Sequence, residues 1–268
     1  MKIEHIISTM HRTEFSFLEQ MNLHLDGIVV NQGREEDLDS YQTKNGFRYQ
    51  IYSTLERGLS RSRNMLIEKS VDADICIIAD DDVEYRDNYE TTVHDAYKRH
   101  PDADIIVFCF SHEKDRDTRV QYTRDIRIHM WNISKAASVE ITFKRDAVVK
   151  AGLHFNDRIG LGATYPSGEE NAFLADALRA GLKIYHVPKT TCFAVEEHAL
   201  QTQNEDEVED YLVNKGAAFH CVYKNWFFLY ALGFILLKKK TLFQNIGIWQ
   251  AWKCMRRGKQ DYLASMEN

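Results

Sequence analysis

The stretch Ile75-Cys-Ile-Ile-Ala-Asp80-Asp81-Asp82-Val83 decides the fold, because an apolar run ends there in three consecutive carboxylates. A short apolar run predicts a buried β-strand, and the carboxyl end of such a strand is where an α/β sheet binds its ligand. Adjacent acids repel one another unless a cation or a set of donors neutralises them. Mg²⁺ and Mn²⁺ prefer carboxylate oxygen and accompany phosphate-bearing substrates, whereas the alternative interpretation is a solvated acidic turn.

The composition is that of a soluble globular protein. Hydrophobic residues make up 44% and charged residues 28% of the 268 positions, and the net charge of -6 gives no support for a nucleic-acid partner. The five cysteines are odd in number and never form a C-x-x-C pair, which argues against disulfides and structural zinc. The amino terminus lacks the apolar core of a signal peptide, so we expect a cytoplasmic protein.

Strand-like and helix-like segments alternate in the way that builds a mostly parallel α/β sheet. The expected strands are Ile3–Ser8, Gly27–Asn31, Arg48–Ser53, Ala73–Ala79, Asp104–Phe110, Val139–Phe143 and Leu182–Val187. The expected helices are Glu14–Met21, Ser60–Ser70, Asn88–His100, Arg145–Lys150 and Glu169–Ala180. No internal repeat and no low-complexity linker divides them.

Three further segments carry candidate chemistry. Gly58-Leu-Ser60-Arg61-Ser62-Arg63-Asn64 opens a helix with small and cationic residues, which suits an anionic ligand, although Ser60 could be only a helix cap. The Gly-rich loop from Gly160 leads through Gly168 into a helix that begins with Glu169 and Glu170. Such acids are either partners of the helix dipole or a general base for an incoming hydroxyl. His198, after two glutamates, is either a solvated residue or a metal ligand.

In their order along the chain, these motifs resemble those of the family-two inverting glycosyltransferases with the GT-A fold. The resemblance covers about residues 1 to 200. It includes Ser62-Arg63-Asn64, the acidic triplet as the D-x-D site, Phe155-Asn-Asp157 with Gly160-Leu-Gly162, and Gly168-Glu-Glu170 as the base motif. The chain departs from the family at Asn31-Gln32-Gly33-Arg34, where many members have an Asp-Asp-Gly-Ser loop. Glu170 also stands where Asp is common.

The resemblance implies a Rossmann-like sheet flanked by helices, and a transferase that moves a sugar from a nucleotide-diphospho-sugar to a glycan or polyprenyl-linked acceptor. Glu170 is the implied base, with Glu169 as the fallback, and Mn²⁺ or Mg²⁺ the implied cofactor. It assigns other positions to donor binding (Ser8, Thr9, Asn31, Arg63, Asp80, Asp81), to the metal (Asp82, Asp80, His198) and to the acceptor (Trp131, Gly168, Glu169). The setting that it implies is the synthesis of a capsule, exopolysaccharide or lipopolysaccharide.

The carboxyl-terminal tail differs in character from the rest of the chain. From Val213 onward it has nine Lys/Arg against two Asp/Glu, and an apolar run, 225–237, ends at Lys238-Lys239-Lys240. That run is shorter than the roughly 20 residues that span a bilayer. Together with Trp249, Trp252, Lys253, Arg256 and Arg257 it predicts an element lying on the inner face of an anionic membrane. A core helix or a homodimer interface is the alternative.

We therefore expect a GT-A domain at 1–212, with a nucleotide-sugar-binding half at 1–110 and an acceptor-binding half at 111–212, followed by a helical tail at 213–268. Two other functions stay open. One is a non-catalytic membrane scaffold of a polysaccharide assembly. The other is a sugar nucleotidyltransferase, although the first strand is followed by Ser8-Thr9-Met10-His11-Arg12 without the Gly-rich triphosphate loop of such enzymes.

Overall fold

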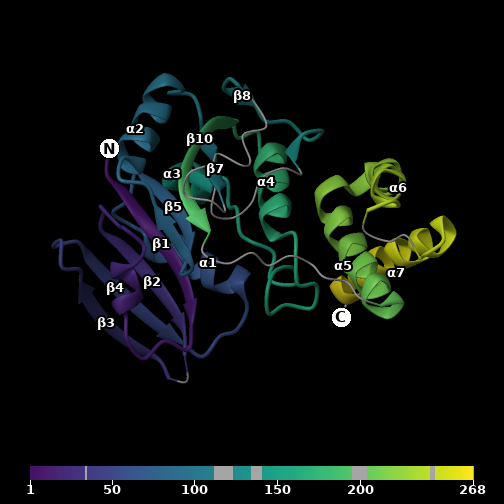
Figure 1. Ribbon diagram of the computed structural model, residues 1–268, viewed down its shortest axis with the longest axis horizontal. Coiled ribbons are helices and arrows are strands. Elements are labelled where there is room, and N and C mark those ends of the chain that lie inside the picture. The colour runs from purple at the N-terminus through teal and green to yellow at the C-terminus, as the bar shows by residue number, and fades with distance from the viewer. Residues whose placement is uncertain (34, 112–122, 134–140, 195–203, 242–244, 268) are drawn as a thin grey trace.

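The computed structural model describes residues 1–33, 35–111, 123–133, 141–194, 204–241 and 245–267, and within these residues ten strands form one sheet (Figure 1). The strands are β1 (Ile3–Met10), β2 (Gly27–Gln32), β3 (Asp37–Gln42), β4 (Arg48–Thr54), β5 (Ile75–Asp80), β6 (Val83–Tyr85), β7 (Ile105–Ser111), β8 (Ile126–Arg127), β9 (Ile141–Lys144) and β10 (Ile184–Ala194). The helices are α1 (Leu59–Lys69), α2 (Tyr89–Arg99), α3 (Arg145–Lys150), α4 (Glu169–Arg179), α5 (Glu205–Tyr223), α6 (Phe227–Lys238) and α7 (Ile248–Glu267).

The sheet is mixed, with the strand order β3-β4-β2-β1-β5-β9-β7-β10-β6. The expected parallel core is present, because β4, β2, β1 and β5 are parallel neighbours and β7 runs parallel to β10. The sheet is less parallel than expected, since β9 lies antiparallel between β5 and β7, and β3 and β6 are antiparallel edges. The expected halves 1–110 and 111–212 both contribute strands to this one sheet.

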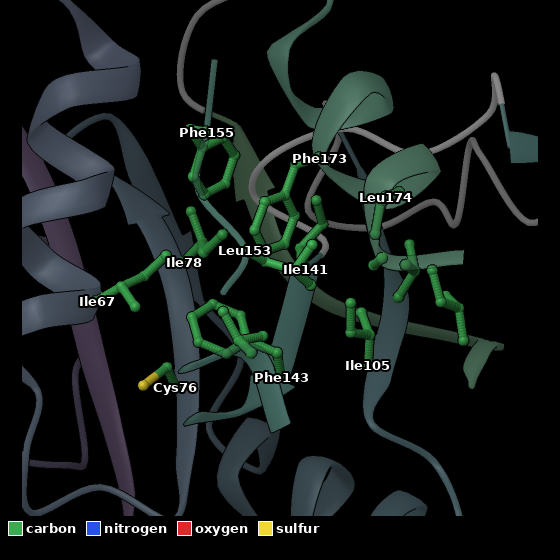
Figure 2. Close-up of a cluster of buried hydrophobic side chains, with 14 of the residues drawn as sticks. Ile67, Cys76, Ile78, Ile105, Ile141, Phe143, Leu153, Phe155, Phe173 and Leu174 are labelled. Atoms are coloured by element: carbon green, nitrogen blue, oxygen red, sulfur yellow. The ribbon is translucent and has the colours of Figure 1, made fainter. Parts of the chain in front are cut away.

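Burial on both faces explains the unbroken apolar strands at the centre of this sheet. Successive residues of a strand point to opposite faces, and Cys76 and Ile78 of β5 join one hydrophobic cluster while Ile75 and Ile77 join the other. Figure 2 shows the first cluster, where Ile67 of α1 and Phe173 of α4 cover β5 and β9. The stacked rings of Phe155 and Phe173, 4.2 Å apart, fix α4 over the sheet.

Some expected elements take a different form. Residues 14–21 were expected to form a helix but contain only a 3-10 turn, η1 (Ser16–Glu19). Strands β3 and β6 were not expected: β3 is almost entirely exposed and so has no apolar alternation, and β6 is three residues long.

The tail forms a helical unit beside α4 (Figure 1). It begins with α5 at Glu205, so the expected boundary at residue 213 falls inside a helix. A 3-10 turn, η4 (Lys224–Trp226), separates α5 from α6. Gly216 and Gly258 lie where α5 crosses α7, and a methyl group on either would overlap the carbonyl oxygen of Met255 or Val213. Glycine therefore lets the two helix backbones meet.

Candidate active site

The acidic triplet lies at the carboxyl end of β5, as expected of a ligand site in an α/β sheet. Asp80 is the last residue of β5, and Asp81 and Asp82 form the turn into β6. Asp81 accepts hydrogen bonds from the Thr9 hydroxyl at 2.5 Å and from Arg12 Nη2 at 2.8 Å. The parallel neighbour β1 supplies Thr9 and the loop after it supplies Arg12, because the carboxyl end of β1 lies at the same edge of the sheet.

The guanidinium group of Arg63 contacts both acidic motifs, the triplet at residues 80–82 and the glutamates at 169–170. Arg63 of α1 has a fully buried side chain, and its Nη2 donates to both oxygens of Asp80 at 3.1 and 3.4 Å. Its Nη1 lies 3.3 Å from Glu169 Oε1 and 3.7 Å from Glu170 Oε1. Three segments, near residues 63, 80 and 169, thus meet at one cation. Arg63 was expected in donor binding, and in the structure its buried side chain pairs with three carboxyls and so positions those groups.

The three carboxyl groups around Arg63 are not equivalent. Burial raises the pKa of Glu169 well above its ordinary value, and the neighbouring Glu170 carboxyl raises it further, against the pull of Arg63. Burial alone would lower the pKa of Arg63, but Asp80, Glu170 and Glu169 outweigh it and the net shift is upward. A single positive charge therefore faces Asp80, Glu170 and a Glu169 that tends to keep its proton.

The tail contributes a second cation to this region. Burial lowers the pKa of Lys215 on α5, while Glu170 and Glu169 act in the opposite direction. Gly168, expected as an acceptor contact, has φ +101° and lies so close to α5 that a Cβ would be 2.8 Å from Ala218 Cβ. Its role in the structure is thus to let the start of α4 pack on α5, which brings Lys215 near the glutamates.

The loop before α4 is held against the start of α1. Ser60 Oγ donates to the carbonyl oxygen of Ile159 at 2.6 Å, and the Leu59 amide donates to Leu161 at 2.9 Å. Asn64 both donates to and accepts from the backbone of Phe155, at 2.9 and 2.7 Å. The two sequence motifs, residues 58–64 and 155–162, therefore form one structure that fixes Arg63 and α4 together.

A cavity of about 600 Å³ opens beside Arg12 at the same end of the sheet. Its walls include His11, Phe15, Asn31, Asp37 and Ser53. Asn31 exchanges hydrogen bonds with the backbone of Arg12 at 3.2 and 2.9 Å and so holds the loop after β1. This cavity adjoins Asp81 through Arg12, which gives a ligand space next to the acidic turn.

Other expected site residues lie elsewhere. Ser8 is buried and accepts a hydrogen bond from Ser62 Oγ at 3.0 Å, so it joins β1 to α1. Trp131 is 69% exposed and follows β8, which pairs with Tyr185 and His186 at the start of β10. This puts β8 at the start of β10 (Figure 1), whereas the acidic turn follows the carboxyl end of β5, and the acceptor role of Trp131 stays a prediction. Glu169 is buried and turns inward to Arg63.

The oxygen donors at the turn suit a hard divalent cation, but most already have partners. Among the described residues, no three His, Cys, Asp or Glu side chains are grouped to hold a metal ion. The charge of Asp80 is balanced by Arg63 and that of Asp81 by Arg12. Asp82 is partly exposed on the turn, and it stays the expected ligand of Mn²⁺ or Mg²⁺. His198 lies outside the described residues.

Two residues of the site were not expected from the sequence. Arg12 follows the first strand directly, so its place at the carboxyl end of β1 was a usable signal. Lys215 lies on a tail helix and reaches the glutamates through a contact between helices, for which the sequence carries no local signal.

No protein-family model matches the sequence, and no curated protein matches it. Solved structures match over nearly the whole chain. S. aureus TarS 1-349 in complex with UDP-GlcNAc superposes with a TM-score of 0.61 at 10% identity, covering 99% of this chain and 92% of that one. The same TarS fragment in complex with UDP gives a TM-score of 0.59 at 12% identity, covering 92% and 76%. Full-length TarS gives 0.60 at 11% identity, and the chain spans 55% of its length. The chain therefore has the fold of the glycosyltransferase TarS.

Proposed function

We propose that this protein is an inverting glycosyltransferase that moves a sugar from a nucleotide-diphospho-sugar to a hydroxyl group of a glycan or lipid-linked acceptor. The observation that carries the proposal is the Arg63 network, which holds Glu170 at a fixed place beside the acidic turn in a fold that TarS uses with UDP-GlcNAc. The cavity at Asn31 and Arg12 has the place and size for the nucleotide. Cell-surface polysaccharide synthesis on the cytoplasmic side of a membrane is the setting we propose.

The reaction is a single in-line displacement. The acceptor oxygen attacks the anomeric carbon, and Glu170 takes the hydroxyl proton as the new bond forms. The bond from the anomeric carbon to the diphosphate oxygen breaks on the opposite side, its electron pair leaves with the nucleotide diphosphate, and the anomeric configuration inverts. Arg63 keeps the Glu170 carboxylate in position, and Arg12 with Asp81 fixes the turn that faces the donor.

A divalent cation would be held by Asp82 and by diphosphate oxygens of the donor, and it would offset the negative charge of the leaving group. The tail supports the base from the other side, since Lys215 places a second cation near Glu170.

A donor screen tests the proposal. UDP-GlcNAc, other UDP-sugars, and GDP-, dTDP- and CMP-linked sugars are incubated with the protein and Mn²⁺, and release of free nucleotide is measured, with a thermal-shift assay in parallel. We expect one UDP-linked sugar to stabilise the protein and to be hydrolysed slowly without an acceptor, and Glu170→Gln to keep the thermal shift while losing the hydrolysis. A protein that neither binds nor cleaves any donor would instead be the non-catalytic scaffold. Nuclear magnetic resonance of a transferred product would report the anomeric configuration.

A further inference from the structure

The helix α6 leaves one apolar side uncovered by any described part of the chain. Phe227, Ala231 and Ile235, four residues apart, face α5 and α7 and are buried. The opposite side and the neighbouring start of α7 form a surface that we call the α6 face, which contains Trp226, Phe228, Leu229, Leu232, Leu236, Leu237, Ile248 and Trp249. Leu237 is 80% and Trp249 78% exposed. Soluble monomers seldom expose so many large apolar side chains together, and such a patch is typical of an interaction surface.

Cations border the α6 face. Lys238 and Lys240 are exposed at the carboxyl end of α6, and Lys253 and Arg256 follow Trp249 on α7 by one and two helical turns. Lys259 lies over the Phe228 ring at 4.8 Å. The α6 sequence itself contains no acidic residue. An apolar centre with a cationic border and tryptophans at its ends fits the interface of a bilayer that contains anionic lipids.

We propose that the α6 face docks the protein on an anionic membrane surface, with α6 lying in the plane of the interface. A second copy of the chain fits the face less well, because a two-fold interface brings the same patch together and its cationic border would meet another cationic border, with no acidic residue of α6 between them. The helix α6 is also unsuited to cross a membrane. The stretch Asp206–Lys238 is long and apolar enough to cross a membrane by composition, but the turn at Lys224 divides it. Its first helix is packed into the protein through Leu212 and Ala217. The remaining twelve residues of α6 reach about 18 Å, against a hydrocarbon core of about 30 Å.

The α6 face lies at one end of a cavity that leads to the start of α4. A cavity of about 530 Å³ runs from Gly168 and Asn171, at the start of α4, to Leu237 and Lys238 at the edge of the α6 face. Between these ends its walls are aromatic, with Tyr211, Tyr223, Tyr230 and Phe234 among them. Docking through α6 would therefore bring the Leu237–Lys238 end of this cavity to the bilayer. The inference that the cavity brings a membrane-held acceptor near Glu170 rests on the proposed function. The inference that the α6 face docks on a membrane does not.

Vesicle flotation of the full chain tests the docking without any substrate. The probes are phosphatidylcholine vesicles with and without one quarter phosphatidylglycerol. The face is altered by Leu229→Glu with Leu236→Glu, and the matched control is Leu38→Glu with Val71→Glu, which changes the charge equally at two similarly exposed positions outside the tail. The border is altered by Lys238→Gln with Lys240→Gln, and its control is Lys44→Gln with Lys98→Gln. Thermal unfolding shows that each variant is folded, and donor hydrolysis is measured alongside.

We expect the wild-type chain to float with the anionic vesicles, the two leucine changes to abolish binding, and the two lysine changes to weaken it about 25-fold, because each lysine contributes about 5-fold. Both controls should bind like the wild type, and salt should weaken binding without removing it. Absence of wild-type binding, or equal binding of the face variant and its control, would overturn the proposal. So would a wild-type dimer that Leu229→Glu with Leu236→Glu converts to a monomer. Donor hydrolysis should be unchanged in every variant, so a failure here is separate from a failure of the proposed reaction.

Discussion

Arg63 organises the candidate site because a single buried guanidinium contacts carboxyl groups from two distant motifs. A buried charge is tolerated only when it is paired, and here the pairing also sets the distance between the turn that faces the donor and the proposed base. Lysine could not replace it, since a point charge lacks the fork that contacts Asp80 on one side and the glutamates on the other.

The role of Glu170 is open to a direct test. Glu170→Gln should lower turnover by about 10²- to 10⁴-fold while donor affinity changes little, because a base acts in the transition state. Initial rates and donor titrations of the purified variant measure both. Glu169→Gln is the comparison, and the assignment would be reversed if that variant were inactive and Glu170→Gln active.

Glu169 should make stability depend on pH. Its raised pKa means that the folded state keeps a proton that the unfolded chain releases, so its contribution is complete below the ordinary value of 4.5 and is lost as the pH rises toward the folded value. Glu169→Gln imitates the protonated form at every pH. The melting temperature of this variant relative to the wild type should therefore rise between pH 5 and pH 8. A difference that stays constant over this range would show that Glu169 does not titrate as inferred.

Asp82 carries the metal prediction. We expect Asp82→Asn to fold normally, since it relieves repulsion within the triplet, but to lose most activity and the Mn²⁺-dependent part of the donor-induced thermal shift. Chelation of the wild-type protein with EDTA should have the same effect, and added Mn²⁺ should restore it. Full activity in excess EDTA would remove the metal from the mechanism.

At the scale of helices and strands, the apolar periodicity of the sequence predicted the elements that are buried in the core and missed those that are exposed. The strands β1, β2, β4, β5 and β7 and the helices α1, α2 and α4 follow from apolar runs or apolar faces that are buried in the structure. The edge strand β3 has exposed residues on both faces, and it forms because β4 supplies backbone partners. The acidic triplet could be located in the sequence because the buried strand before it is apolar. Its pairing with Arg63 and Arg12 could not be predicted, because it depends on contacts between elements that are distant in the sequence.

The crossing of α5 and α7 allows a prediction about glycine. Gly258→Ala should destabilise the protein by about 2 kcal/mol, because its methyl group meets the carbonyl oxygen of Val213 and the helices must separate. Gly233→Ala on α6 is the matched control: nothing lies within 4 Å of its Cβ position, so it should stabilise the helix by up to about 1 kcal/mol. Urea unfolding of both variants gives the comparison. Equal stabilities would mean that the two helices are not in close contact.

At the scale of the whole molecule, the tail belongs to the fold. Val222 and Tyr223 of α5 join the core cluster that contains Phe143 and Phe173, and Ala217 and Tyr262 pack with Ile159 of the loop before α4. A chain that ended before Asn204 would therefore lack side chains that cover its main hydrophobic core. The tail is therefore better regarded as the closing layer of the site than as an appendage.

This predicts a single unfolding transition. Three of the four tryptophans (226, 249 and 252) lie in the tail, so tryptophan fluorescence reports mainly on that unit, whereas circular dichroism reports on the whole chain. The two signals should give the same urea midpoint. A chain cut before Asn204 should melt well below the full-length protein. A fluorescence transition at clearly lower urea would show that the tail unfolds by itself.

The Arg63 network also constrains which changes the lineage of this protein can accept, and in which order. Three carboxyls share one guanidinium, so exchange of Glu169 for an amide leaves every remaining charge paired. Exchange of Arg63 first leaves Asp80 without its guanidinium partner, and it leaves the two glutamates with the buried Lys215 as their nearby cation. The four positions are therefore epistatic: the effect of a change at one depends on what occupies the others, and the arginine becomes replaceable only after its acidic partners have gone. Double-mutant cycles should be strongly non-additive among these positions, and homologous chains should lose the acids before the arginine.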